Sequence, residues 1–295
     1  MELADADERW VEVSGSKILT LCKGTGPPVM FLHGYPETSS AWRYAFDGLA
    51  NDYSCFAPDL PGWGRSTSSR SASLPHFIDA IASLIEQLRL PAVVLVGHDW
   101  GAAVAYGLAL REPARVRRLI TVNFSPCRFE LWRAWHFGFF ALPFLPDLIM
   151  RVWPGALEKR WLHNWANRTD AFPTLVVDSY RRAAATPDAR KTTLHSYRHL
   201  VRRALLGRPP LDMGPTASRR QNPTAPWDII WGMNDPVATP RVLDFLLAEF
   251  PGLRIERISG AGHFPHEETP AQFVASLRFL LADDTHRSRM LRAPL

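Results

Sequence analysis

The chain has 295 residues, of which 46% are hydrophobic and 21% charged, as in an ordinary soluble globular protein. The formal net charge of +5 is carried by arginines spread along the chain, so we expect a solvated surface and no nucleic-acid partner. No stretch offers about 18 consecutive apolar residues, and the start MELADADERW lacks the features of a signal peptide. This excludes a membrane-spanning chain and favours a cytoplasmic protein with no membrane partner.

The first part of the chain alternates short apolar runs with helical patterns. Residues 10–13 and 17–23 alternate in polarity around Gly15, which predicts an antiparallel hairpin. Apolar runs typical of buried strands and segments with helical spacing then follow one another. The predicted strands are 29–32, 55–57, 92–96 and 119–122, and the predicted helices are 75–88 and 102–111.

Residues 125–224 interrupt this alternation, because they are helical and aromatic at first, then basic, and finally rich in proline. The alternation then resumes with strands at 228–231 and 254–258 and helices at 241–250 and 270–281, before a polar tail that we expect to be mobile. Strands alternating with helices indicate an α/β protein with a mostly parallel sheet flanked by helices. We therefore predict an α/β core from residues 1–124 and 225–295, with 125–224 inserted as a helical cap.

The strongest local pattern is Gly-His-Asp-Trp-Gly at residues 97–101, which lies between a predicted strand and a predicted helix. This is the context of a nucleophile elbow, where a strained turn flanked by small residues holds one side chain above the sheet. The residue so placed is Asp99, whose carboxylate can attack carbon directly and form an ester. The alternative for Asp99 is an ordinary helix N-cap.

Two backbone N–H groups are candidates for an oxyanion hole. The pattern His-Gly-Tyr-Pro at residues 33–36 follows a buried strand, so its loop can aim the Tyr35 N–H at a developing oxyanion. The N–H of Trp100, directly after Asp99, supplies the second donor. A plain turn is the alternative for residues 33–36.

The candidates for base and acid follow the last two predicted strands. His263 lies in the glycine-flanked loop 260–264 and can act as a general base on water. Asp235, in Trp-Gly-Met-Asn-Asp-Pro, can orient the imidazole, although an Asx turn before Pro236 is the alternative. Asn123 is a weaker candidate for the acid because an amide carries no charge, and we expect His266 to lie on the surface.

These patterns resemble the α/β-hydrolases of the epoxide hydrolase type, which are related to haloalkane and fluoroacetate dehalogenases. The resemblance covers nearly the whole chain and rests on residues 33–43, 59–66, 97–101, 231–236 and 260–264. It implies the α/β-hydrolase fold with an inserted cap. It also implies catalysis by Asp99, Asp235 and His263 through a covalent aspartyl ester, without a metal or cofactor. The implied reaction opens an epoxide to a vicinal diol.

In such epoxide hydrolases two cap tyrosines bond the epoxide oxygen. Here Tyr197 matches the second of them, His136 stands in place of the first, and Tyr180 could substitute for either; a core role is the alternative for His136. The aromatic cap favours a small apolar or aromatic substrate. The residues that we expect to contact substrate are His33, Pro36, Trp100, Trp135, Phe137, Tyr180 and Phe264.

Two other functions compete with this interpretation. A dehalogenase uses the same Asp–His–Asp triad, and Trp100 could be one of the two donors that hold a halide, but Tyr35 replaces the usual asparagine. Phe137 and Trp100 both depart from the pattern of fluoroacetate dehalogenases. A non-catalytic ligand-binding protein on the same fold is the alternative of another class, and the complete triad argues against it.

Overall fold

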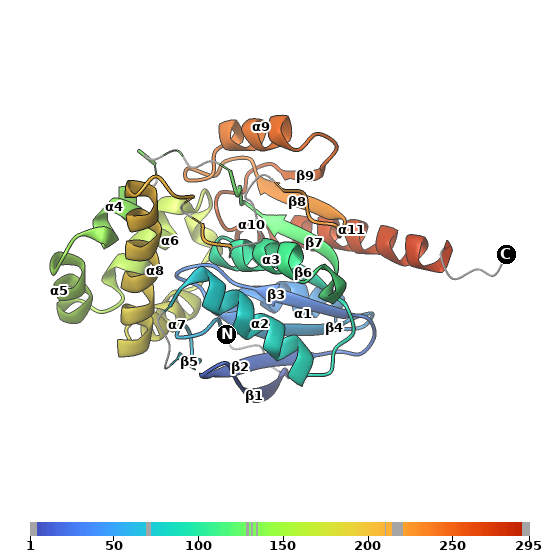
Figure 1. Cartoon of the computed structure of the whole chain (residues 1–295), viewed down its shortest axis with the longest axis horizontal. Coiled ribbons are helices and arrows are strands. Elements are labelled where there is room, and N and C mark those ends of the chain that lie inside the picture. The colour runs from blue at the N-terminus through green and yellow to red at the C-terminus, as the bar shows by residue number, and fades with distance from the viewer. Residues whose placement is uncertain are drawn as a thin grey trace.

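The structure is a computed structural model that describes residues 5–68, 72–127, 130, 132–133, 135–209, 211–213 and 221–290, without the side chains of 283–290. Its described strands form one nine-stranded sheet in the order β1-β2-β4-β3-β6-β7-β8-β9, with β5 paired to β2 (Figure 1). The pairs β1/β2, β2/β4 and β2/β5 are antiparallel, and the sheet is parallel from β4 to β9. The strands are β1 Asp7–Val13, β2 Ser16–Lys23, β3 Pro28–Leu32, β4 Ser54–Pro58, β5 Thr67–Ser68, β6 Val93–His98, β7 Val116–Val122, β8 Trp227–Gly232 and β9 Arg254–Ile258.

Helices cover both faces of this sheet. Helices α2 and α3 lie on the face toward the viewer in Figure 1, and α1 and α11 lie behind it. Every residue of β3 and β6 is consequently buried, which explains their continuous apolar character. The helices of this part of the chain are α1 Arg43–Leu49, α2 Leu74–Gln87, α3 Trp100–Arg111, α9 Pro240–Glu249, α10 Pro265–Glu268 and α11 Pro270–Met290, with short 3-10 turns at Ser39–Trp42 and Pro113–Arg115.

Between β7 and β8 the described residues form helices and no strand. These helices gather at the left of Figure 1, beside the carboxyl ends of the parallel strands. Their arrangement supports our proposal that residues 125–224 are a cap on a core made of 1–124 and 225–295. They are α4 Trp135–Ala141, α5 Leu145–Val152, α6 Ala156–Trp165, α7 Thr174–Ala184 and α8 Pro187–Leu205, with a 3-10 turn at Thr169–Ala171.

The strands and helices predicted for the core are confirmed to within a few residues. The sequence did not reveal α1, β5 and α10, which have seven, two and four residues and are too short for a clear period. Helix α11 continues to Met290, so the tail that we expected to be mobile begins as helix. Within the described part of the chain, no helix has the length and apolar character needed to cross a bilayer.

Candidate active site

Asp99 lies in the turn between β6 and α3 with a φ of 48°, a left-handed conformation that is unusual for a residue other than glycine. Both flanking glycines are sterically required. A Cβ on Gly97 would lie 2.6 Å from the carbonyl oxygen of Gly101, and a Cβ on Gly101 would lie 2.1 Å from that of Leu32. The turn therefore has the strained geometry and the close packing that the glycine pattern predicted for an elbow.

The loop after β3 packs directly against Asp99. The Tyr35 backbone N–H donates to Asp99 Oδ1 at 3.2 Å. Gly34 allows this approach, because a Cβ there would lie 2.6 Å from the Cβ of Asp99. The backbone N–H of Tyr35 thus points at the Asp99 carboxylate. The sequence predicted this N–H as one of the two donors of an oxyanion hole.

The imidazole of His263 lies between two carboxylates. Its Nδ1 is 2.7 Å from Oδ2 of Asp235, and its Nε2 is 4.0 Å from Oδ2 of Asp99. The other oxygen of Asp235 accepts the N–H groups of Val237 and Ala238 at 2.7 and 2.9 Å. The structure therefore brings Asp99, Asp235 and His263 together, with Asp235 fixed so that it can orient the imidazole.

Asn123 supports this arrangement from the end of β7. Its side-chain N–H₂ donates to Oδ2 of Asp235 at 2.5 Å and to the Gly262 carbonyl at 3.1 Å. Its side-chain oxygen accepts the N–H of Gly232 at 2.9 Å. Asn123 therefore holds the loops that carry Asp235 and His263, and the side chain that contacts the imidazole is Asp235.

The charges around His263 favour its protonated form. Burial alone would lower the pKa of His263, but Asp235, Asp99 and Glu37 outweigh burial and raise that pKa to about 9. At neutral pH the imidazole is therefore a cation between two carboxylates. Ester formation would remove the negative charge of Asp99. Because that charge helps to raise the pKa of His263, its loss brings the pKa down toward the range of a general base.

This protonation predicts a pH dependence of stability. The pKa of His263 is about 9 when folded and about 6.5 when unfolded, so its contribution is fully present below pH 6.5 and is lost as the pH rises through 9. Between these values we expect the wild type to lose about 3 kcal/mol more unfolding free energy than His263→Gln, as measured by urea unfolding. Parallel curves for the two proteins would contradict the assignment.

Two cap residues face Asp99 from the other side. The ring of Tyr197 lies edge-on to that of Trp100, with the ring centroids 5.4 Å apart. Burial and the charge of Asp99 hold the pKa of Tyr197 well above its usual value. The ring of His136 lies 5.8 Å from that of Tyr197. These contacts leave Tyr197 a neutral donor near the carboxylate.

His136 is also neutral at ordinary pH. Burial and the nearby His263 lower the pKa of His136 to about 3, and its Nδ1 has no hydrogen-bond partner among the described residues. His136 and Phe137 line a small cavity of about 50 Å³ together with Asp99 and His263. The remaining lining residues are Asn123, Phe124, Ser125, Glu130, Trp165, Val237, Ala238 and Val242. The cavity therefore joins the cap to the triad.

Several residues expected to bind substrate have other partners. Both ring nitrogens of His33 bond backbone groups, the Leu60 N–H at 2.9 Å and the Gly34 carbonyl at 2.8 Å. The hydroxyl of Tyr180 donates to Glu267, which also pairs with Arg43. The polar atoms of both side chains already have partners within the protein. Neither residue is therefore part of the site proposed below.

The other expected contact residues lie at varied depths. Trp135 is 53% exposed on the outer surface of α4, and Pro36 is buried in the loop after β3. Phe264 is fully buried, with its ring 5.1 Å from that of His263. Trp100 is nearly buried and Phe137 half-buried, so only Phe137 of these five lines the small cavity.

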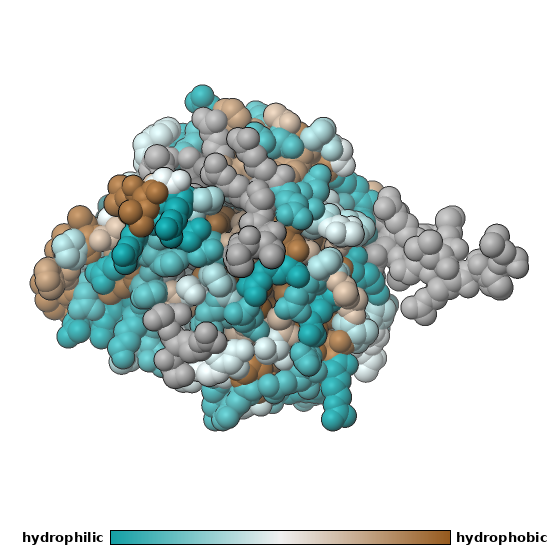
Figure 2. All heavy atoms as spheres, viewed as in Figure 1, coloured by the Kyte–Doolittle hydropathy of each residue, from teal (hydrophilic) through white to brown (hydrophobic). Residues whose placement is uncertain are grey.

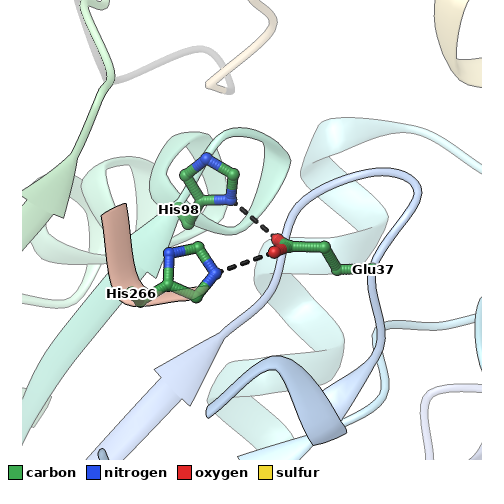
Figure 3. A group of neighbouring side chains, drawn as sticks. All are labelled: Glu37, His98 and His266. Carbon is green, nitrogen blue, oxygen red and sulfur yellow. Dashed lines mark hydrogen bonds and ion pairs between the residues drawn. The ribbon is translucent and has the colours of Figure 1, made fainter. Parts of the chain in front are cut away.

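Glu37, His98 and His266 form a buried polar group (Figure 3), and the ring of His98 lies 4.9 Å from that of His263. His266 Nε2 donates to one oxygen of Glu37 at 2.7 Å, and His98 Nδ1 lies at hydrogen-bond distance, 2.8 Å, from the other oxygen. The second ring nitrogen of His98 donates to the carbonyl of His263 at 2.8 Å. The two histidines outweigh burial and hold the pKa of Glu37 well below its usual value.

This group corrects one prediction and was otherwise missed. His266 was expected on the surface, yet it is 1% exposed, because it follows His263 on α10 and stacks on Trp42 with ring centroids 4.5 Å apart. Glu37 and His98 lie within the motifs of Tyr35 and Asp99, and His266 lies two residues after the motif of His263, which is the signal that could have found them. Although such side chains can bind metals, their bonds here join the backbones that carry Asp99 and His263.

Glu268 ties the loop of His263 to the cap. Its carboxylate accepts the N–H groups of Gly262 and Phe264, on both sides of His263, each at 3.0 Å. It also accepts the N–H groups of the cap residues Asn167 and Arg168, each at 2.8 Å.

Two further contacts join this loop to the cap. The N–H of His263 itself donates to the Trp165 carbonyl at 3.0 Å. A Cβ on Gly262 would lie 2.5 Å from the nitrogen of Asn167, so the glycine is needed for this packing. The base loop and the cap are therefore fastened to each other.

Comparison with known proteins agrees with this geometry. Residues 27–270 match the alpha/beta hydrolase fold family. A protein named epoxide hydrolase from Caballeronia sordidicola is 38% identical over 117 residues, which span 38% of this chain and 36% of that protein. Haloalkane dehalogenase 2 of Mycobacterium tuberculosis is 26% identical over 290 residues, which span 94% of this chain and 95% of the relative. The matches thus include proteins named for each of the two reactions considered above.

Solved structures share the fold over almost the whole chain. Cfl2 from Burkholderia cenocepacia superposes with a TM-score of 0.81 at 25% identity, covering 94% of this chain and 96% of the other. The epoxide hydrolase VrEH1 from Vigna radiata superposes with a TM-score of 0.80 at 22% identity, covering 96% and 100%. At the identity of VrEH1 the likeness concerns the fold alone.

Proposed function

Because this chain belongs to the alpha/beta hydrolase fold family, we propose that its site opens an epoxide to a vicinal diol through a covalent ester on Asp99. The observation that carries the proposal is that a nucleophile with its base and a set of hydrogen-bond donors lie around one small cavity. Asp99 and His263 form one wall, and the cap residue His136, with Tyr197 close by, forms the other. A nucleophile thus faces donors suited to a leaving oxygen that remains attached to the substrate.

In the first step a carboxylate oxygen of Asp99 attacks one epoxide carbon. The bond from that carbon to the ring oxygen breaks, and the electron pair passes to the oxygen. Tyr197 donates a hydrogen bond to the developing alkoxide, assisted by His136 through an N–H. The pKa of His263 falls when Asp99 loses its charge, so the imidazolium gives a proton to the alkoxide. The products of this step are a hydroxyalkyl ester and a neutral imidazole.

In the second step neutral His263 removes a proton from water, and the resulting hydroxide attacks the ester carbonyl of Asp99. Asp235 stabilises the imidazolium that forms, at its hydrogen-bond distance of 2.7 Å. The backbone N–H groups of Tyr35 and Trp100 hold the tetrahedral oxyanion. On collapse the bond from the Asp99 carbonyl carbon to the ester oxygen breaks, and the departing alkoxide takes the proton of the hydroxyl group that water added. The diol is thus released with Asp99 as a carboxylate and His263 as an imidazolium, so the cycle balances with side chains and water alone.

The residue at position 35 favours an epoxide over a haloalkane. A halide site needs two free side-chain N–H donors beside the nucleophile, and one of the usual positions holds Tyr35, which has no such donor. Its side-chain hydroxyl donates to Glu158 at 2.6 Å and is turned into the cap. The aromatic walls of the cavity favour a small apolar or aromatic epoxide.

A single turnover in heavy-oxygen water tests this mechanism. With enzyme in excess over styrene oxide, we expect the diol to carry one ordinary oxygen from Asp99 and the heavy oxygen to appear in the protein. Mass spectrometry of the diol and of the Asp99 peptide measures both. Heavy oxygen in the first-turnover diol would refute the ester, whereas turnover of 1-chlorobutane but of no epoxide would replace the proposed reaction by dehalogenation.

A further inference from the structure

The outer helix of the cap exposes large apolar side chains to solvent. Figure 2 shows hydrophobic side chains gathered at the left end of the molecule, where Figure 1 places α5. We call this surface the α5 face. It consists of six side chains that are between 44% and 85% exposed, namely Leu142, Phe144, Leu145, Leu148, Val152 and Trp153.

The α5 face follows from the helical spacing of the apolar residues of α5. Pro146 and Met150 are buried on the inner side of α5, while Leu145, Leu148 and Val152 recur at helical spacing on the outer side. Directly before the helix, Phe144 has a φ of 61° and is 85% exposed, so a strained backbone holds an aromatic ring in solvent. Monomeric proteins rarely leave such side chains together on one element without a partner.

Arginines surround this apolar surface. Arg151 of α5 and Arg190 of α8 both pair with Asp147, at 2.9 and 3.2 Å. Arg198 of α8 donates to the carbonyl of Leu142 at 3.0 Å. Two guanidinium groups therefore share the carboxylate of Asp147, the third bonds a backbone carbonyl, and the border of the α5 face is positively charged.

The part of the cap that holds its helices carries an excess of positive charge. Residues 135–213 contain twelve Lys and Arg against six Asp and Glu, whereas the rest of the chain contains 22 against 23. The excess positive charge of the protein is thus concentrated in the part that carries the α5 face. A symmetric contact between two copies through this face would bring two positive caps together, which disfavours a second copy as the partner.

We propose that the α5 face docks on the surface of an anionic lipid bilayer. Leucine, phenylalanine and tryptophan side chains would enter the boundary between headgroups and acyl chains, and the arginines would lie among anionic headgroups. Contact of this kind lies in the interface plane and needs no spanning helix. It therefore departs from our expectation of no membrane partner, which rested on the lack of a spanning segment and of signal-peptide features. The bilayer would also hold apolar molecules beside the cap.

Sedimentation of the full chain with vesicles tests the proposal without any measurement of catalysis. We expect binding to phosphatidylcholine vesicles that contain about 30% phosphatidylglycerol, weak binding to phosphatidylcholine alone, and loss of binding as salt rises. Arg151→Glu, which reverses one border charge, should weaken the partition at least about fivefold. Leu148→Ser combined with Phe144→Ser should weaken it about tenfold or more.

Phe279→Ser is the matched control, because Phe279 is 58% exposed on α11, at the opposite end of the molecule in Figure 1. This control should bind the anionic vesicles as the wild type does, and all variants should keep the wild-type circular dichroism. Failure to bind the anionic vesicles would overturn the proposal. So would a stable dimer that Leu148→Ser dissociates, which would assign the α5 face to a second copy of the chain.

Discussion

The His263→Gln variant is expected to form the ester on Asp99 once and then stop. Asp99 can attack the epoxide without a base, because a carboxylate is already ionised, so the first step survives with a loss limited to the missing proton of the imidazolium. The second step needs a base near the ester, and in the wild type the imidazole Nε2 is the one 4.0 Å from Asp99. We expect ester hydrolysis to fall by roughly 10³-fold or more.

Mass spectrometry of the intact variant measures this arrest. After mixing with excess styrene oxide, the protein should gain the mass of one substrate, and the peptide that contains Asp99 should carry it. Asp99→Ala is the control and should gain no mass. Asp235→Asn should accumulate less ester than His263→Gln, because the base remains but loses its orienting charge. If His263→Gln formed no adduct and still turned over the epoxide, His263 would have no role in the second step.

The Tyr197→Phe variant is expected to form the ester roughly 10- to 1000-fold more slowly, the range for loss of one donor at a developing charge. Burial and the charge of Asp99 hold the pKa of Tyr197 well above its usual value, so its proton stays available for the epoxide oxygen. The phenylalanine ring preserves the stacking on Phe140, whose centroid is 4.8 Å away, so the loss should be chemical rather than structural. Rapid mixing under single-turnover conditions measures the ester-forming step directly.

Tyr180→Phe is the matched control in the cap. Tyr180 is also buried, but its hydroxyl donates to Glu267 rather than toward Asp99. We expect it to leave the rate of ester formation within about threefold of the wild type while lowering stability by about 1–3 kcal/mol, because the Glu267 carboxylate loses a donor. Slow ester formation in Tyr180→Phe, with a normal rate in Tyr197→Phe, would exchange the two assignments.

The sequence predicted the core elements because their signals are local. A continuous apolar run such as that of β6 or the helical spacing of α2 reports burial directly, and the structure confirms both. The glycines around Asp99 carry a similar local signal, since Gly97 and Gly101 have no room for a side chain. Asp99, Asp235 and His263 each follow a predicted strand, and because parallel strands end at one edge of a sheet, the structure brings the three together.

The partners of individual polar side chains were harder to predict. The expectations for His33, Tyr180 and His266 depended on which way each side chain turns, and that is decided by contacts such as Leu60 and Glu267 that are distant in sequence. The cap poses the same difficulty, because its helices pack on one another through irregular aromatic contacts without a repeating period. A pattern can therefore place a residue near the site without identifying its hydrogen-bond partner.

The bonds of Glu268 determine which edge of the cap can open. The cavity of about 50 Å³ is too small for a substituted epoxide, so admission of a substrate requires movement. Along the seam formed by residues 165–168, movement would break the bonds to the Asn167 and Arg168 N–H groups and the bond from the His263 N–H. We therefore expect the cap to turn about this seam and to open at the opposite rim, because such a movement leaves these bonds and the position of the general base intact.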